Sequence, residues 1–139
     1  GVNILEPVIE WADDYSIKSF KLSKLAILEV KNLRKQKVNV AFYDSEYKAH
    51  VIENIVLDDK NELNTVTVDF KGKVEAVIIN FDDHAYCKVR FDQRTLDNLE
   101  ANMYRIDDFL CRSIVWRQLW VLVMDCQMSS VQYFNFVIN

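Results

Sequence analysis

The chain has 139 residues, of which half are hydrophobic and 12% are aromatic; this is enough for one substantial core or two small ones and excludes a disordered protein. Its 17 basic and 21 acidic residues give a net charge of −4. It therefore lacks the basic excess that attracts phosphate backbones, and we expect no nucleic-acid partner. The apolar run at residues 119–124 is far shorter than the roughly 20 residues of a membrane helix, so we expect no membrane segment.

The first 91 residues have the pattern of a series of short strands. Pro7, the only proline, indicates that residues 4–11 form an edge strand or the first strand. Val38, Val40 and Phe42 alternate with other residues, which is the period of a strand with one buried face. Gly72 lies in a compact turn and predicts that the strands on either side of it pair as a hairpin. The predicted strands are residues 4–11, 16–22, 38–43, 50–57, 63–70, 74–81 and 86–91. Strands at this spacing predict an antiparallel β-sandwich for residues 1–91.

The pattern becomes helical at residue 92. Asp92 is a good N-cap for a helix that runs to about residue 103, with Leu96 and Leu99 as a narrow apolar stripe. Asp107 and Asp108 suit the start of a second helix, because acidic side chains stabilise the positive end of the helix dipole.

That second helix is expected to reach about residue 126, and its apolar residues cover more than one face, so it should be buried on several sides by other helices. Ser129 and Gln132 form a capping-box pattern that opens a third helix. Residues 120–124 and 133–138 also have the β-branched and aromatic content of strands, but the segment lengths and the caps favour helix.

Asp82, Asp83 and His84 are the most ligand-like cluster, because carboxylates and an imidazole can together bind a transition metal. Adjacent residues point in different directions, however, and His50, the other histidine, is distant in sequence. We therefore favour a polar turn between two strands and keep a metal hydrolase built on these residues as an alternative.

No complete active-site motif occurs: the sequence has no HExxH, GxSxG, GxGxxG or P-loop. We accordingly assign no catalytic, cofactor-binding or metal-binding residue to this chain. Trp116 and Trp120 are spaced to pack between helices, which we favour over a ligand-stacking pair. The basic run at residues 31–37 is expected to be a solvated loop, which we favour over an anion-binding patch.

The cysteines indicate the redox environment. Cys87, Cys111 and Cys126 cannot all pair within one chain, and no spacing between them is a CxxC. Separated cysteines among apolar neighbours predict reduced, buried thiols, with Cys87 as a core thiol that lacks a neighbouring base. Because disulfides are rare in reducing compartments, we expect a cytoplasmic location.

The segment NFDDHAYCKVRFD, residues 80–92, resembles the zinc-dependent aminopeptidase N family. In that family an N-x-D-D-x-x-Y-x-[KR]-[VI]-x-x-D pattern ends a small β-sandwich domain and leads into the C-terminal helical domain. Lys88 occupies a position of this pattern at which arginine is more common in the family. The sequence pattern of the family continues after this segment, at Leu99, residues 106–108, Leu110, Arg112 and residues 116–120. At the other end of the chain, the GVN of residues 1–3 resembles the sequence found where the catalytic domain of the family ends.

The resemblance implies a spacer domain at residues 1–91 and the first helices of the helical domain at residues 92–139. In the family, the zinc ligands and the G-x-M-E-N loop belong to the preceding catalytic domain, so zinc would be held by the parent enzyme and not by this chain. The expected partners are that catalytic domain, later helices and the parent's peptide substrate. The alternative is a stand-alone β-sandwich interaction module with a helical tail.

Two structural expectations follow from this division. Tyr86, Val89 and Phe91 should be anchored at the boundary, because the same stretch ends one core and orients the next helix. The helical residues 107–139 should expose an apolar patch and form a homo-oligomer of the fragment. The expected patch consists of Leu119, Trp120, Leu122, Val123, Phe134 and Phe136.

Overall fold

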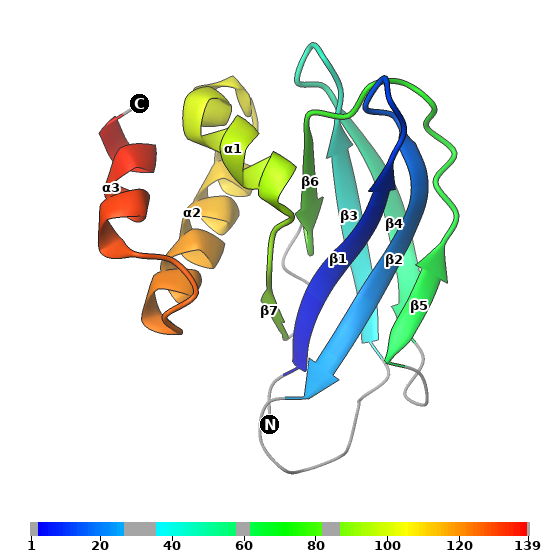
Figure 1. The fold of residues 1–139 in the computed structure, drawn as a ribbon, viewed down its shortest axis with the longest axis horizontal. Helices are drawn as coiled ribbons and strands as arrows, with labels where there is room; N and C mark the ends of the chain where they lie inside the picture. The colour runs from blue at the N-terminus through cyan, green and yellow to red at the C-terminus, as the bar shows by residue number, and fades with distance from the viewer. Residues whose placement is uncertain (1–2, 27–35, 58–61, 82–86, 139) are drawn as a thin grey trace.

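The computed structural model describes residues 3–26, 36–57, 62–81 and 87–138. In these residues all the strands precede all the helices, as predicted, and the helices lie on one side of the strands, next to β6 and β7 (Figure 1). The strands are β1 (Asn3–Trp11), β2 (Ile17–Ala26), β3 (Gln36–Tyr43), β4 (Ala49–Leu57), β5 (Leu63–Val66), β6 (Ala76–Ile79) and β7 (Cys87–Val89). The helical elements are α1 (Gln93–Asn102), the 3₁₀ turn η1 (Met103–Arg105), α2 (Phe109–Met124) and α3 (Ser130–Ile138).

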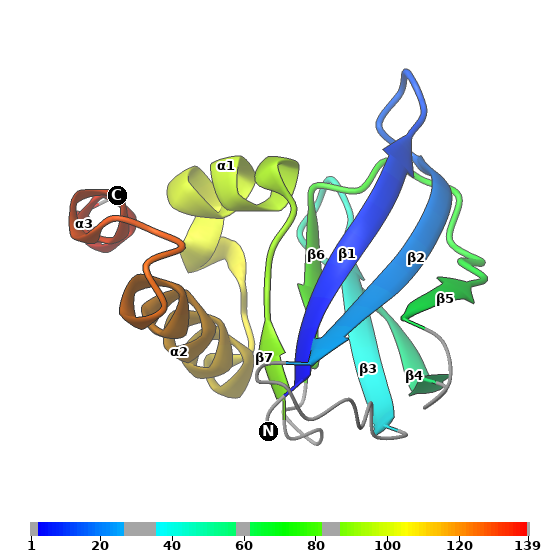
Figure 2. The same ribbon diagram turned by 60° about the horizontal axis from the view of Figure 1, so that its bottom comes forward.

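The strands form two sheets, with the orders β5-β2-β1-β7 and β4-β3-β6 (Figure 2). The sheets share a buried apolar cluster, in which the rings of Phe20 on β2 and Phe42 on β3 meet edge to face at 5.3 Å. The expected all-antiparallel pairing is wrong at one position, since β7 pairs with β1 in parallel. The chain reaches β7 only after it has crossed to the second sheet and returned twice, so no tight turn joins β1 and β7 and their directions can agree.

The predicted hairpin around Gly72 is also wrong. β5 ends at Val66 and pairs with β2, whereas β6 pairs with β3 in the other sheet. The segment around Gly72 is therefore a connection between sheets. A larger residue at this position would displace an aromatic ring: a Cβ at Gly72 would lie 2.6 Å from Cζ of the Phe70 ring, which itself stacks on His50 at 4.0 Å.

Strand β3 is buried on both faces near its C-terminal end, where one buried face was predicted. Val40 and Phe42 belong to the cluster between the sheets. Ala41 and Tyr43, which alternate with them, belong to a second cluster formed with the helices. The alternation in the sequence is real, but the helices cover the face that would otherwise be solvated.

The predicted helix starts are confirmed. Asp92 accepts a hydrogen bond from the backbone N–H of Thr95 at 3.0 Å, and Asp108 caps α2 in the same way. Ser129 Oγ accepts from the N–H of Gln132 at 3.1 Å before α3. Residues 120–124 lie in α2 and residues 133–138 lie in α3, so the strand alternative is wrong.

Helix α2 is not covered on all sides. It buries Cys111, Ile114, Val115, Gln118, Leu119 and Leu122. Leu110 and Trp120 remain 64% and 47% exposed, so the expected burial on several sides is wrong for this chain. The expected apolar patch is also partly wrong, because packing within the cluster of helices and strands buries Leu119, Leu122 and Phe136. Among the described helices, none is both long and apolar enough to cross a membrane.

Candidate functional site

The helices and the strands share one apolar core, which is the basis of the junction between them. This junction cluster contains buried residues from the outer face of the β4-β3-β6 sheet and from all the helical elements. Its members are Ala41, Tyr43, Tyr47, Ala76, Ile78, Leu99, Met103, Ile106, Cys111, Val115, Leu119, Leu122, Met128 and Phe136. Because the same side chains stabilise both parts, the position of the helices on the sheet is set by close packing.

The expected anchor residues lie at this junction. Val89 at the end of β7 is 4% exposed and belongs to the cluster between the sheets. Phe91, two residues further on, is partly buried and packs against the junction cluster. These two neighbours thus contribute to different cores, as expected, and Tyr86 lies outside the described residues.

Thr95 hydrogen-bonds the start of α1 to β6. Its Oγ1 accepts from the backbone N–H of Val77 at 2.9 Å and donates to Asp92 Oδ1 at 2.5 Å. Thr95 and Val77 are both buried, so this hydrogen bond is shielded from bulk solvent. Burial raises the pKa of Asp92, although its hydrogen bonds from Thr95 act in the opposite direction.

Thr95→Val should lower the free energy of unfolding by about 1–3 kcal/mol, because it keeps the shape but leaves the buried Val77 N–H without an acceptor. Urea denaturation measures the loss. Thr65→Val, on the exposed side of β5, is the matched control and should change stability by less than about 0.5 kcal/mol. Equal midpoints for the two variants would contradict this role for Thr95.

A polar network continues along the same helix. The Tyr47 hydroxyl donates to Asn98 Oδ1, and Asn98 Nδ2 donates to Glu75 Oε2 at 2.8 Å. The Arg105 guanidinium lies 4.7 Å from the centre of the Tyr47 ring and donates to the carbonyl of Ser45 at 3.1 Å. These contacts attach α1 and η1 to the loops at one end of the β4-β3-β6 sheet.

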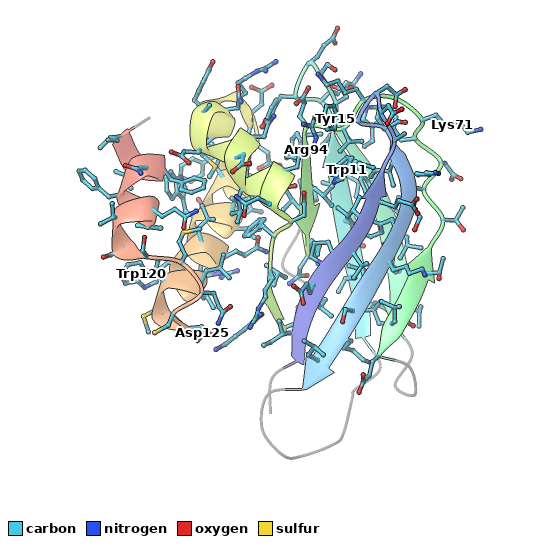
Figure 3. The ribbon with its side chains drawn as sticks, in the orientation of Figure 1. Trp11, Tyr15, Lys71, Arg94, Trp120 and Asp125 are labelled. Atoms are coloured by element: carbon cyan, nitrogen blue, oxygen red, sulfur yellow. The ribbon has the colours of Figure 1, made fainter. Side chains whose placement is uncertain are left out.

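Arg94 is the centre of this polar region. Its Nε and Nη2 donate to the carbonyl of Val74 at 3.2 and 3.0 Å, and Nη2 lies 3.2 Å from Glu75 Oε2. The guanidinium also stacks at 3.9 Å on the ring of Tyr15 and lies 5.3 Å from the ring of Trp11. Figure 3 shows Trp11, Tyr15 and Arg94 gathered between α1 and the turn that joins β1 and β2.

A cavity of about 450 Å³ opens beside Arg94, and we call it the Arg94 cavity. Its lining combines two aromatic rings, one cation, one carboxylate and two carboxamides. The lining residues are Trp11, Tyr15, Arg94, Asp97, Asn98 and Asn102. The volume is within the range of small-molecule sites, and four of the six lining residues are polar or charged.

No protein-family model matches the sequence. An alignment 148 residues long with an aminopeptidase N of Streptomyces lividans has 25% identity. It covers all of this chain and 17% of that protein. The whole chain is similar to one segment of an aminopeptidase. Its fold is also similar to part of Legionella pneumophila aminopeptidase A, whose crystal structure contains aspartic acid, with a TM-score of 0.60, 15% identity, and coverage of 99% of this chain and 16% of the other.

The aminopeptidase-like segment thus spans about a sixth of the length of these two proteins. Within the described residues, no group of three His, Cys, Asp or Glu side chains could hold a metal ion, so these residues do not fit a zinc site. The cluster Asp82, Asp83 and His84 lies outside the described residues. His50 is half-buried, contacts Asp44 at 2.8 Å and is stacked on Phe70.

The tryptophan pair packs within the protein. The rings of Trp116 and Trp120 both meet the ring of Tyr133 on α3, at 5.8 and 5.4 Å, which confirms packing between helices. Most of the basic run at residues 31–37 lies outside the described residues. Its last member, Lys37, is exposed on β3.

The cysteine predictions have mixed outcomes. No disulfide joins any of the three cysteines, all of which are described. Cys111 is buried, with Sγ 3.2 Å from the Tyr43 hydroxyl, and burial raises the pKa of both groups. Cys87 is half-buried. Cys126 is exposed, which contradicts the predicted burial, because it follows the C-terminal end of α2 where the chain turns at the surface.

Two further contacts tie α2 to the strands, and the sequence did not predict them. Lys88 on β7 forms an ion pair with Asp125, the residue after α2: Nζ of Lys88 lies 3.0 Å from Oδ1 and 2.9 Å from Oδ2. Gln118 in α2 donates to the carbonyl of Ile79 at the end of β6 at 3.0 Å. Arg94 and its aromatic partners were missed as well, because they meet only after the β1–β2 turn and α1 are packed together.

Proposed function

We propose that this chain is a non-catalytic segment of a zinc aminopeptidase that removes N-terminal amino acids from peptides. The observation that carries the proposal is the similarity to an aminopeptidase N over the whole chain, while that protein is about six times longer. The catalytic zinc and its ligands would then lie in the rest of the parent protein. Residues 1–91 would be a β-sandwich spacer and residues 92–139 the first helices of a superhelical domain that covers the active-site cleft.

The proposed role is mechanical: the segment holds the helical cover at a fixed position relative to the catalytic domain. The shared junction cluster, the Thr95–Val77 hydrogen bond and the Lys88–Asp125 ion pair support this role, because they attach the helices to the strands at separate points. Covers of this kind exclude water and restrict which substrates reach the catalytic groups. A rigid spacer keeps that geometry constant.

The proposed partners are the catalytic domain of the parent, its later helices and its peptide substrate. Apolar side chains on the outer surface of the helices support a contact with later helices, since they are the kind of surface that proteins cover. The exposed residues are Phe109, Leu110, Trp120, Met124, Val131, Phe134, Val137 and Ile138.

The isolated chain should neither retain zinc nor release amino acids from aminoacyl reporter substrates, whereas the parent protein should do both. A catalytic zinc needs three protein ligands, and the described residues offer no such group. Elemental analysis after dialysis and a reporter assay with and without a chelator measure the two properties. The reading frame of the parent should encode an HExxH before residue 1.

Stoichiometric zinc or chelator-sensitive hydrolysis by the isolated chain would overturn the non-catalytic assignment and would favour the Asp82, Asp83 and His84 cluster. The variant His84→Ala distinguishes the two cases, since it would abolish that zinc binding. A parent protein that holds zinc but hydrolyses no aminoacyl substrate would contradict the proposed aminopeptidase.

A further inference from the structure

We propose that the Arg94 cavity binds a small zwitterion of the α-amino acid class. Its volume of about 450 Å³ is within the range of small-molecule sites, and it is open to solvent. Its lining offers both charges, hydrogen-bonding carboxamides and two aromatic rings in one place. This inference rests on the cavity alone, so it does not depend on the proposed function of the parent.

The two charged residues of the cavity are close but do not pair with each other. Arg94 and Asp97 are three residues apart on α1 and therefore lie on the same face of the helix. The carboxylate partner of Arg94 is Glu75 at 3.2 Å, and Asp97 instead accepts from Gln93 at 2.7 Å. Arg94 and Asp97 therefore do not neutralise each other, and a ligand that carries both charges could contact both of them.

The unused hydrogen-bonding groups match such a ligand. Nε and Nη2 of Arg94 are engaged by Val74 and Glu75, whereas its Nη1 has no acceptor among the described residues. The Nη1 donors suit a ligand carboxylate. One oxygen of Asp97 accepts from Gln93, which leaves the other to accept from a ligand ammonium.

The aromatic wall suits an apolar ligand side chain. Tyr15 has φ 61°, a left-handed conformation that bulky residues rarely adopt and that glycine would occupy more easily. This backbone nevertheless places the Tyr15 ring against Arg94 at 3.9 Å, with Trp11 on the same wall.

The charges also select against simpler ligands. A plain anion would meet the carboxylate of Asp97 in the lining and that of Glu75 beside Arg94. A plain cation would leave the Nη1 donors of Arg94 without an acceptor. An α-amino acid offers its carboxylate to Nη1 of Arg94 and its ammonium to Asp97.

The test is a titration of the chain with L-phenylalanine, followed by the indole N–H resonances of its three tryptophans. We expect saturable binding with a Kd of about 1 mM or tighter, seen as a shift of the Trp11 resonance while those of Trp116 and Trp120 stay in place. The variant Trp11→Phe assigns the resonance. N-acetyl-L-phenylalanine lacks the ammonium and L-phenylalaninamide lacks the carboxylate, so both should bind at least about tenfold more weakly.

Asp97→Asn tests the site, and Glu100→Gln is its matched control on the same helix but outside the lining. Asp97 is exposed, so its substitution should leave the fold intact, which thermal denaturation checks. Asp97→Asn should weaken L-phenylalanine binding by about tenfold or more, the loss typical of a hydrogen bond to a charged group, and Glu100→Gln should not weaken it.

Three results would overturn the inference: no saturable shift of Trp11, equal binding of either derivative, or equal effects of the two carboxylate variants. An α-amino acid is also the product class of the activity proposed for the parent. Failure of this titration would leave that activity untouched, and a parent without aminopeptidase activity would leave the binding result untouched.

Discussion

Leu99→Ala should lower the free energy of unfolding by about 2–5 kcal/mol, because it opens a cavity in the cluster shared by the strands and the helices. Leu99 is 0% exposed and packs in that junction cluster from α1. Leu110→Ala is the matched control, since Leu110 is a leucine on α2 that is 64% exposed. The control should change stability by less than about 0.5 kcal/mol.

Urea denaturation, followed by far-UV circular dichroism and by tryptophan fluorescence, tests this expectation. Trp11 lies on β1, whereas Trp116 and Trp120 lie on α2, so fluorescence reports on both parts of the chain. Because one cluster stabilises both parts, the two probes should give a single coincident transition. Separate transitions, or equal losses in the two leucine variants, would show that the strands and the helices fold independently.

Wild-type protein should associate in solution through its helices, and Trp120→Glu should shift it toward the monomer. Trp120 is 47% exposed on α2, and Phe134 and Val131 on α3 are 57% and 71% exposed. Several exposed apolar side chains on neighbouring helices are usually covered in proteins, and a carboxylate among them would have to be desolvated on association. Light scattering across a range of protein concentrations measures the mass.

Leu63→Glu is the control for this experiment, because Leu63 is 48% exposed on β5, away from the helices (Figure 1). It should leave the mass of the wild type unchanged. A wild type that is strictly monomeric at high concentration would show that the helices satisfy their own apolar surface. Such a result would also remove the support that this surface gives to a contact with later helices of a parent protein.

Local signals in the sequence predicted the secondary structure well. Asp92, Asp108 and Ser129 are short polar side chains that bond to backbone N–H groups two or three residues later, so their effect needs no distant partner. The change from strands to helices at residue 92 is likewise a matter of periodicity. The aminopeptidase resemblance was also carried by the sequence, and the similarity to an aminopeptidase N over the whole chain supports it.

Pairing between distant segments could not be predicted in the same way. A compact turn at Gly72 indicates a hairpin unless the strands on either side join different sheets, and that choice depends on where β2 and β3 already lie. The parallel pairing of β1 with β7 depends on the path of almost the whole β part of the chain. Such contacts are decided by how whole strands pack, not by the residues that connect them.

The Arg94 cavity likewise combines local features that the sequence predicts with long-range contacts that it does not. Asp92 indicates a helix start without any distant partner, and the helical period then places Arg94 and Asp97 on one face of that helix. Trp11 and Tyr15 reach that face from the β1–β2 turn through long-range packing, which also covers the outer face of β3 with helices. The physical reason is range: capping and periodicity act within a few residues, whereas cores and cavities form from side chains that are dozens of residues apart.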